Sequence, residues 1–334
     1  MPESLPPVER VRPGIWSVPV PIPNNPLRYV LVYAFETDRG PYIVDAGWNT
    51  DDSYNTLVAG LAQAGFDIKD VKGVLVTHIH PDHYGLAGRV REASGAWVAL
   101  HPEDAALIHD RYTEPSELLE QVGSMLRRVG APEDELKSLQ NASMPALPFV
   151  TAVEPDILME DGEKPDVPGW DLLAIWTPGH SPGHLCFWEP DNRLMLSGDH
   201  VLPRITPNIP LHPQSSADPL GDFLRSLEKV GAYDADEVLP AHEHRFTRLD
   251  IRVEELRQHH EQRFVEVLEA IKDGTDTAWG VASRMHWSRP WERIEGFMRR
   301  AAVGEAMAHL RALEVRGAVR EVWGEPVRWQ VVET

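Results

Sequence analysis

Short hydrophobic runs alternate with turn-forming residues through the first part of the chain. The runs at 15–20, 29–35 and 42–44 are rich in β-branched and aromatic residues and are separated by Pro, Asn and Gly, which predicts a meander of strands. Residues 52–64 have the spacing of a helix. The run at 71–77 is mostly apolar and β-branched, which indicates a strand buried on both faces.

A helical pattern then interrupts the strands. Apolar residues at helical spacing between 117 and 129, and an acidic segment that begins at Pro132, predict two helices. We interpret residues 103–142 as a helical insertion that covers the mouth of a site. Its apolar side chains either line part of an acyl pocket, which we favour, or pack on the rest of the domain. Strand-like runs, each followed by turn residues, return at 172–176, 185–188 and 194–196.

The character of the chain changes near residue 250. Helices are predicted at 252–272, 277–285 and 294–316, and two strand-like runs around Gly324-Glu325-Pro326 predict a hairpin. Three helices followed by a hairpin suggest a winged helix. We therefore predict an α/β protein with a catalytic domain at 1–249 and a winged-helix-like module at 250–334.

Composition narrows the class of protein. The 334 residues are 42% hydrophobic and 25% charged, which is typical of a globular protein. We find no apolar run that approaches the ~20 residues of a membrane span and no signal peptide at the N-terminus, so we expect a cytoplasmic protein without a membrane partner. Cys186 is the only cysteine; it excludes an internal disulfide, and its apolar neighbours predict a buried structural thiol.

The charge is strongly negative and unevenly distributed. The formal net charge is −20, and residues 250–334 hold 13 Lys/Arg and 15 Asp/Glu. The module therefore has a net charge of −2, and residues 1–249 have the remaining −18. A field of this sign repels polyanions, so nucleic acid is not the partner that we expect.

The segment Thr77-His-Ile-His-Pro-Asp-His-Tyr-Gly85 places four candidate metal ligands within six positions. At an extended strand end, residues i and i+2 point the same way, so His78 and His80 can share one metal ion. Pro81 suits the first turn of a helix, from which Asp82 and His83 can face a second ion. One short loop can thus address two adjacent metals.

Three further candidate ligands follow other predicted strands, each beside Gly or Pro. They are His180 in Thr177-Pro-Gly-His-Ser-Pro-Gly-His184, Asp199 in Ser197-Gly-Asp-His200, and His242 in Pro240-Ala-His-Glu-His244. Glycine and proline make the tight turns that direct a side chain off a strand end. A single histidine in such a loop is ordinary, but this combination is improbable as an accident among 15 histidines.

The order and spacing of these motifs resemble the metallo-β-lactamase superfamily over roughly residues 14–250. The resemblance implies an αββα sandwich with a binuclear site at one sheet edge. It implies that His78, His80 and His180 bind one metal, that Asp82, His83 and His242 bind the other, and that Asp199 bridges both. Asp45, in Val44-Asp-Ala-Gly47, would contact the ligand side chains without itself binding a metal. Zinc is the metal that we expect, with iron or manganese as alternatives.

Other residues near the motifs are assigned supporting roles or contacts with substrate. His184, His200 and His244 can brace ligands or donate a proton to a leaving group. Asp82 can orient the attacking hydroxide while it binds metal. Trp48 and Tyr84 either rim a substrate pocket or pack in the core.

Two function classes fit the motifs. The first is hydrolysis of a small thioester, ester or lactone by a hydroxide that bridges two metals, which a resemblance to hydroxyacylglutathione hydrolases favours. The second is a phosphodiesterase or endoribonuclease, because the module resembles one found in a branch that includes a mitochondrial endoribonuclease. β-Lactamase activity is disfavoured because Asp199 stands where the class B1 enzymes have cysteine. A homodimer through the C-terminal helices is a further hypothesis.

Overall fold

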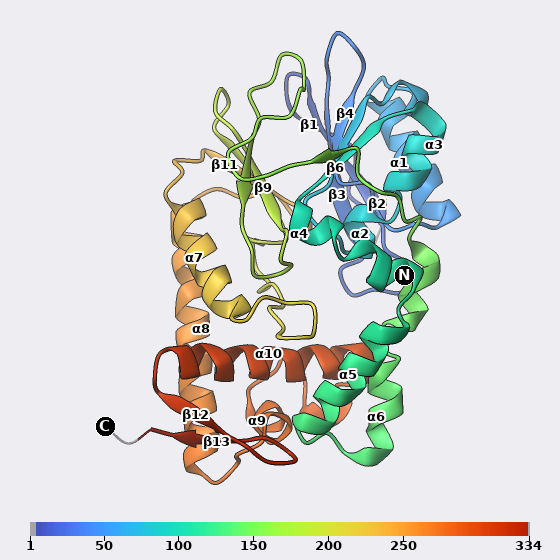
Figure 1. The fold of residues 1–334 in the computed structure, drawn as a ribbon. Coiled ribbons are helices and arrows are strands. Elements are labelled where there is room, and N and C mark those ends of the chain that lie inside the picture. Colours follow the sequence, from blue (N-terminus) through green and yellow to red (C-terminus); the bar gives the residue numbers. More distant parts are fainter. Residues whose placement is uncertain (1–4, 333–334) are drawn as a thin grey trace.

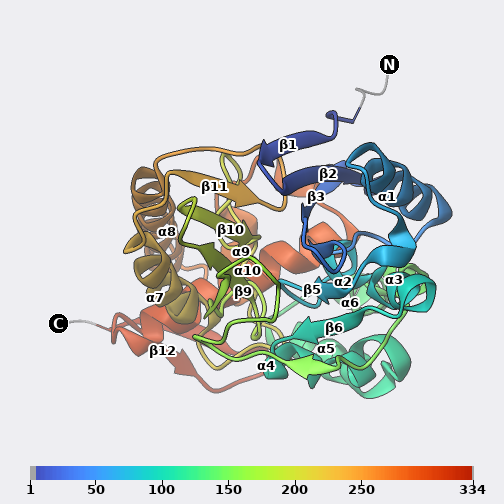
Figure 2. The ribbon, with the colours of Figure 1, turned by 90° about the horizontal axis from the view of Figure 1, so that it is seen from above.

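Two β-sheets face each other and helices cover their outer sides in the computed structural model, which describes residues 5–332 (Figure 1). Seen from above, α1 (Asp51–Gln63) and α3 (Ala87–Ser94) lie outside the first sheet, and α7 (Pro219–Gly231) and α8 (Leu249–Lys272) lie outside the second (Figure 2). A core cluster that contains Ile15, Phe35, Phe187 and Leu196 fills the space between the sheets. The predicted αββα sandwich is therefore confirmed.

The first sheet has its seven strands in sequence order, with antiparallel pairing from β1 to β4 and parallel pairing from β4 to β7. Its strands are β1 (Glu9–Arg12), β2 (Ile15–Pro21), β3 (Tyr29–Phe35), β4 (Tyr42–Val44), β5 (Gly73–Leu75), β6 (Trp97–Leu100) and β7 (Ile157–Leu158). The second sheet is ordered β11 (Glu237–Pro240), β10 (Leu194–Gly198), β9 (Leu185–Glu189) and β8 (Leu173–Trp176).

The helices of the sandwich pack their apolar faces on the outer sides of the sheets. Leu57 and Leu61 of α1 share a core with Val18 and Val32 of the first sheet, and Phe223 of α7 shares one with Met195 of the second. These helices are α1 (Asp51–Gln63), α2 (Pro81–Tyr84), α3 (Ala87–Ser94), α4 (Pro102–Ala105) and α7 (Pro219–Gly231).

The predicted helical insertion contains α5 (Ser116–Arg128), α6 (Glu133–Gln140) and a short π-helical turn, η2 (His109–Thr113). Four of its buried apolar side chains pack on one another and on Trp279; they are Val122, Leu126, Leu136 and Leu139. The expectation that apolar residues of this insertion line a pocket is therefore wrong for these four, because they form a small core of their own.

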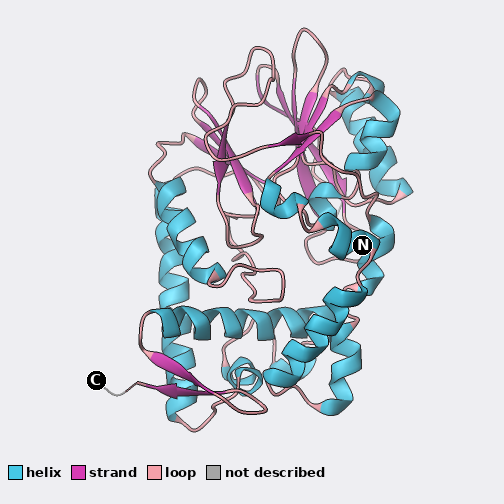
Figure 3. Cartoon of the chain, viewed as in Figure 1, coloured by secondary structure: helices cyan, strands magenta, loops and turns pink. Residues whose placement is uncertain are grey.

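The last part of the chain has the predicted order of elements: α8 (Leu249–Lys272), α9 (Ala278–Arg284), α10 (Gly296–Val315) and the antiparallel hairpin of β12 (Val319–Val322) and β13 (Arg328–Val331). Helix α8 runs down from beside α7 at the second sheet, and α9 and α10 lie below the sheets, with α10 running toward α5 and α6 (Figure 1, Figure 3). Arg299 of α10 forms an ion pair with Glu135 of α6 at 2.9 Å. The insertion and the C-terminal segment thus pack together. No helix within residues 5–332 is both long and apolar enough to cross a membrane.

Candidate metal centre

The first motif lies at the end of strand β5, as predicted. The strand ends at Leu75, and Pro81 then occupies the first turn of α2, with His80 as the residue before the helix. Pro is favoured at this position because its missing N–H would have no partner there. His78 and His80 thus belong to one group of possible ligand atoms, and Asp82 and His83, on the first turn of α2, belong to another.

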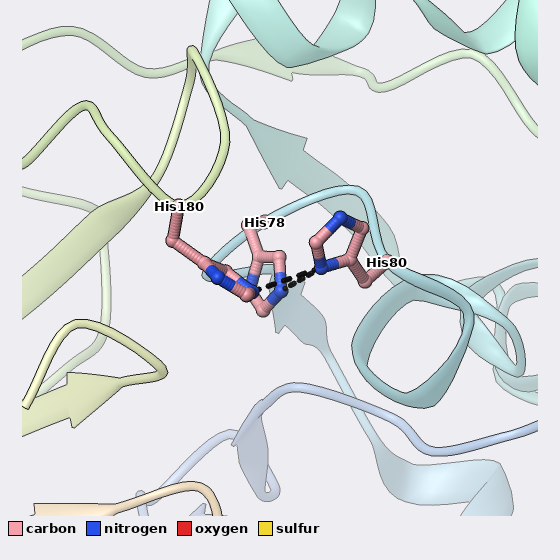
Figure 4. Close-up of side chains that lie close together, drawn as sticks. All are labelled: His78, His80 and His180. Atoms are coloured by element: carbon pink, nitrogen blue, oxygen red, sulfur yellow. Dashed lines mark hydrogen bonds between the residues drawn. The ribbon is translucent and has the colours of Figure 1, made fainter. Parts of the chain in front are cut away.

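Three histidines from two loops form the first group of ligand atoms (Figure 4). His78 Nε2 lies 2.9 Å from His80 Nδ1, and His80 Nδ1 lies 3.0 Å from His180 Nε2. Burial, followed by the charge of neighbouring histidines, holds the pKa of His78 and of His80 well below the usual value. Both rings are therefore neutral near pH 7, which is the form that binds a metal.

Asp82, His83 and His242 form a second group. Asp82 Oδ2 lies 3.3 Å from His242 Nε2 and 3.7 Å from His83 Nε2. Ligand atoms held about 2.0–2.2 Å from one tetrahedral ion are separated by about 3.3–3.6 Å. The spacing in this group therefore suits a shared ion.

Asp199 lies between the two groups. Its Oδ1 is 3.5 Å from His83 Nε2 and 3.2 Å from His242 Nε2, whereas its Oδ2 is 3.5 Å from His180 Nε2. Gly198 lets the chain approach this closely, because a Cβ atom there would lie 2.7 Å from His184 Nε2 and the φ angle is +51°. The two carboxylate oxygens of Asp199 thus face different groups, as expected of a bridging ligand.

The hydrogen bonds of the outer ring nitrogens show that these residues suit a cation. Nδ1 of His180 donates to the carbonyl of Asn208 at 2.8 Å, and Nδ1 of His242 donates to the carbonyl of Tyr29 at 2.9 Å. A carbonyl has no proton to give, so in a neutral ring the inward Nε2 carries a lone pair directed at Asp199. A lone pair facing a carboxylate is unfavourable unless a proton or a metal ion lies between them.

The outer ring nitrogen of His83 also has a hydrogen-bond partner, which is a carboxylate instead of a carbonyl. Its Nδ1 lies 2.8 Å from Asp45 Oδ2, and Asp45 also accepts from the backbone N–H of Thr77 at 2.8 Å. Asp45 has a φ angle of +63°, a costly conformation that non-glycine residues keep mainly where the surroundings impose it. The side chain of Asp45 therefore joins His83 to the backbone just before His78.

Several inward atoms have no hydrogen-bond partner among residues 5–332. They are buried and include His83 Nε2, His242 Nε2 and Asp199 Oδ1. Burial opposes a charge on His242, but Asp199 and Asp82 outweigh it and raise the pKa of His242 to about 10. Asp45, Asp199 and Asp82 likewise outweigh burial and raise the pKa of His83 well above the usual value. Without metal the rings of His83 and His242 therefore hold protons, which metal uptake must release. The donor set fits two divalent ions.

Asp104 of α4 was not predicted as part of the site. Its fully buried carboxylate accepts from Ile79 N–H at 2.8 Å, from Ser181 Oγ at 2.8 Å and from Gly183 N–H at 2.7 Å. Ile79 lies between two candidate ligands and Ser181 follows a third. Asp104 thus ties the two loops that carry the first group.

The three candidate supporting histidines occupy different environments. His184 Nε2 accepts from the backbone N–H of Asp199 at 3.1 Å, and its Nδ1 lies 2.8 Å from Thr177 Oγ1; this ring braces the bridging residue. His200 is fully buried against Phe223. His244 is exposed.

The two aromatic candidates differ in exposure. Tyr84 is fully buried, and its hydroxyl contacts the backbone of Val153 as donor and acceptor, so it packs in the core. Trp48 is half-buried and lies with its ring centroid 5.3 Å from that of Phe149. The predicted buried thiol is confirmed, since Cys186 is fully buried; burial raises its pKa to about 12.

Residues 25–242, which carry all seven candidate ligands, match the family model described as the metallo-beta-lactamase superfamily. The chain belongs to this superfamily. It is 25% identical to the probable metallo-hydrolase YqjP of Bacillus subtilis over 308 residues, which are 88% of the chain and 90% of that protein. It is 22% identical to a beta-lactamase-like protein 2 homolog of Caenorhabditis elegans over 97% of the chain and 92% of that protein.

Solved structures of the superfamily extend the similarity over the C-terminal helices. A metallo-beta-lactamase family protein from Thermus thermophilus is 33% identical, with a TM-score of 0.83 over 97% of this chain and 100% of that one. A beta-lactamase domain protein from Burkholderia ambifaria is 25% identical, also with a TM-score of 0.83, over 97% and 94%. The protein is therefore a metal-dependent hydrolase of this superfamily.

Proposed function

We propose that this enzyme hydrolyses a small carboxylic thioester, ester or lactone, with thioesters as the preferred subclass and zinc as the metal. The observation that supports two-metal hydrolysis most strongly is the position of Asp199, whose two oxygens face His242 and His180 at 3.2 and 3.5 Å. Two bound ions would supply a water nucleophile near neutral pH and polarise the scissile carbonyl.

The residues of the chain have defined parts in this proposal. His78, His80 and His180 would hold one ion, and Asp82, His83 and His242 the other. Burial raises the pKa of Asp82, but His83 and His242 outweigh it and lower the pKa below the usual value. Asp82 is therefore ionised near pH 7 and can accept a proton from the attacking water.

Charge supports an acyl substrate over a nucleic acid. Residues 1–249 have a net charge of −18, which disfavours a polyphosphate track. Three arginines of the C-terminal module that could contribute to a basic stripe are paired with acids: Arg299 with Glu135, Arg311 with Glu314 and Arg316 with Glu261. Within residues 5–332, Arg300 and Arg320 form no ion pair. The three pairs reduce the positive charge available to a phosphate backbone.

We also propose that residues 250–334 form a winged helix that serves packing or dimerisation. The order of three helices and a hairpin supports the first part. Exposed apolar side chains support the second, including Trp323 at 90% exposure and Val315 at 67%.

The experiment is a hydrolase panel on metal-replete protein, with thioesters, lactones, phosphodiesters and single-stranded RNA. We expect the most efficient substrate to be an acyl compound and the Asp199→Asn variant to lose that activity. The proposal fails if RNA or bis-nitrophenyl phosphate is cleaved about a hundredfold more efficiently than every acyl substrate, a difference of about 2.7 kcal/mol in transition-state free energy.

A further inference from the structure

Two arginines and a histidine from distant parts of the sequence lie near one another and near His80: the charges of Arg111 and Arg300 act on His212, and the charge of Arg111 also acts on Arg300 and His80. They are Arg111 of η2, His212 of the loop between β10 and α7, and Arg300 of α10, and we refer to them as the arginine cluster. Nε of Arg111 donates to Gln214 Oε1 at 3.0 Å, two residues beyond His212. The insertion, the sandwich and the C-terminal module thus each contribute one member.

The arginine cluster adjoins the metal centre through two connections. Tyr112, next to Arg111, donates its hydroxyl to the carbonyl of Ile79 at 2.7 Å, between His78 and His80. The loop of His212 also provides the carbonyl of Asn208, which accepts from His180 Nδ1 at 2.8 Å. His180 and His212 line one small recess together with Gly179, Pro182, Pro210, Ser215, Ser216 and Pro219.

Neither arginine has an acidic partner. Within residues 5–332, no carboxylate oxygen lies within 4.0 Å of the guanidinium group of Arg111 or Arg300, although the chain has 52 acidic residues. By contrast, the neighbouring Arg299 pairs with Glu135 at 2.9 Å, and the buried Arg263 pairs with Glu305 at 3.2 Å. The charge of the buried Asp104 acts on Arg111 without an ion pair between them. Two half-buried arginines that form no ion pair are unfavourable unless an anion joins them.

The donors of the arginine cluster are available to a ligand. The guanidinium of Arg111 interacts with Gln214 Oε1 and with the hydroxyl of the neighbouring Tyr112, which leaves most of its five N–H groups for a ligand. His212 Nδ1 accepts from the backbone N–H of Gln214 at 3.1 Å, so in the neutral ring the proton is on Nε2, which can donate. Burial, and then the charges of Arg111 and Arg300, lower the pKa of His212 to about 3, so the ring is neutral near pH 7.

Arg300 has a structural role that the other two lack. Its Nη1 donates to the carbonyls of Leu139 and Gln140 at 3.2 and 3.3 Å, at the end of α6, and its Nη2 contacts Ser143. Burial and the charge of Arg111 lower the pKa of Arg300 to about 10, so it remains charged. Arg111 is therefore the member whose removal tests binding without breaking the contact between α6 and α10.

We infer that the arginine cluster binds an anionic group, a carboxylate or a phosphate, at the non-reacting end of the substrate. The inference rests on the proposed function, because the reacting carbonyl of that substrate would lie at the metal centre. The planar fork of Arg111 matches either anion with two parallel hydrogen bonds, and His212 Nε2 adds a third donor. The substrate class is thus narrowed to acyl compounds that also carry a negative charge.

The test compares three probes on zinc-loaded protein by titration calorimetry: glutarate, 4-phosphonobutyrate and butyrate. Butyrate offers one carboxylate for the metals, and the other two add a second anion for Arg111. Wild-type protein should bind at least one of the longer probes about tenfold more tightly than butyrate, the effect of one charge-assisted hydrogen bond. The probe that shows the gain identifies the preferred anion.

Variants distinguish binding by the arginine cluster from a general effect of positive charge on anion binding. Arg111→Gln should abolish the gain, and Arg111→Lys, which keeps the charge but lacks the fork, should retain part of it. Arg127→Gln, which removes an exposed arginine from the same insertion, should keep the full gain. The inference is overturned if wild type shows no gain, or if folded Arg111→Gln binds the longer probes as wild type does.

Kinetics then provides a second readout that depends on the proposed function. For a thioester with a terminal carboxylate, Arg111→Gln should raise KM about tenfold with kcat nearly unchanged, and KM for an uncharged thioester should stay constant. Equal losses on both substrates would contradict the inference. Absence of acyl hydrolysis would refute the proposed function. The calorimetry needs no turnover, so it would still decide whether the arginine cluster binds an anion.

Discussion

Replacing Asp104 with alanine should loosen the first group of metal ligands as well as the fold. The substitution removes the acceptor of the Ile79 N–H, the Gly183 N–H and the Ser181 hydroxyl, which lie 2.7–2.8 Å from the carboxylate. Ile79 lies between His78 and His80, and Ser181 follows His180. Both loops therefore lose the side chain that joins them.

The magnitude follows from the three bonds. Each buried donor left without a partner costs about 1–3 kcal/mol, and removing a buried carboxylate, whose pKa is raised by burial, returns part of that. We therefore expect Asp104→Ala to lower the free energy of unfolding by about 3 kcal/mol or more. Asp104→Asn, which keeps one acceptor oxygen, should lie between alanine and wild type.

The assay is urea unfolding of metal-free protein, followed by metal analysis of the refolded variants. Asp38→Asn is the matched control, because Asp38 is exposed in the turn between β3 and β4; it should change neither quantity. A loss of stability by Asp104→Ala within about 0.5 kcal/mol, the range of ordinary surface substitutions, together with full metal content, would refute the reasoning.

Three further predictions concern other parts of the molecule. Asp199→Asn should lower turnover at least about a hundredfold with an intact fold, because it weakens the ligand between the two groups; unchanged turnover of the metal-loaded variant would contradict this. Cys186 should not react with a thiol reagent at about pH 8 until the protein unfolds, since burial keeps its pKa near 12; rapid labelling of native protein would contradict it. The module at 250–334 should not bind duplex DNA with submicromolar affinity at physiological salt, because its net charge is −2; steeply salt-dependent binding of that strength would show otherwise.

The local parts of the site could be predicted because they are encoded within a few residues. The period of two in an extended segment places His78 beside His80, and Pro81 indicates the helix that turns Asp82 and His83 toward the second group. The same reasoning places Asp199 after a strand. Each of these predictions requires only the geometry of a strand end and of one helical turn.

Contacts between distant segments could not be predicted in this way. Asp104 reaches Ile79 and Gly183 across 25 and 79 positions in the sequence, and a single aspartate after a short strand carries no pattern that marks it. The arginine cluster likewise depends on how α10 packs against the insertion.

Hydrophobic periodicity also leaves the partner of a helix undetermined. The apolar face of the insertion was predicted, but only the fold shows that Leu126 and Leu139 face each other and Trp279 instead of a substrate. Helix α7 was missed although Phe223, Leu227 and Val230 of its buried face have helical spacing.

Metal content is the measurement that tests the binuclear centre most directly. Protein purified without chelators and supplemented with zinc, manganese or iron should contain close to two metal ions per chain by elemental analysis, because seven ligands exceed what one tetrahedral ion requires. The Asp199→Asn variant should hold its metals less tightly during dialysis. A stoichiometry that never exceeds one ion per chain, with any of the three metals, would contradict the account.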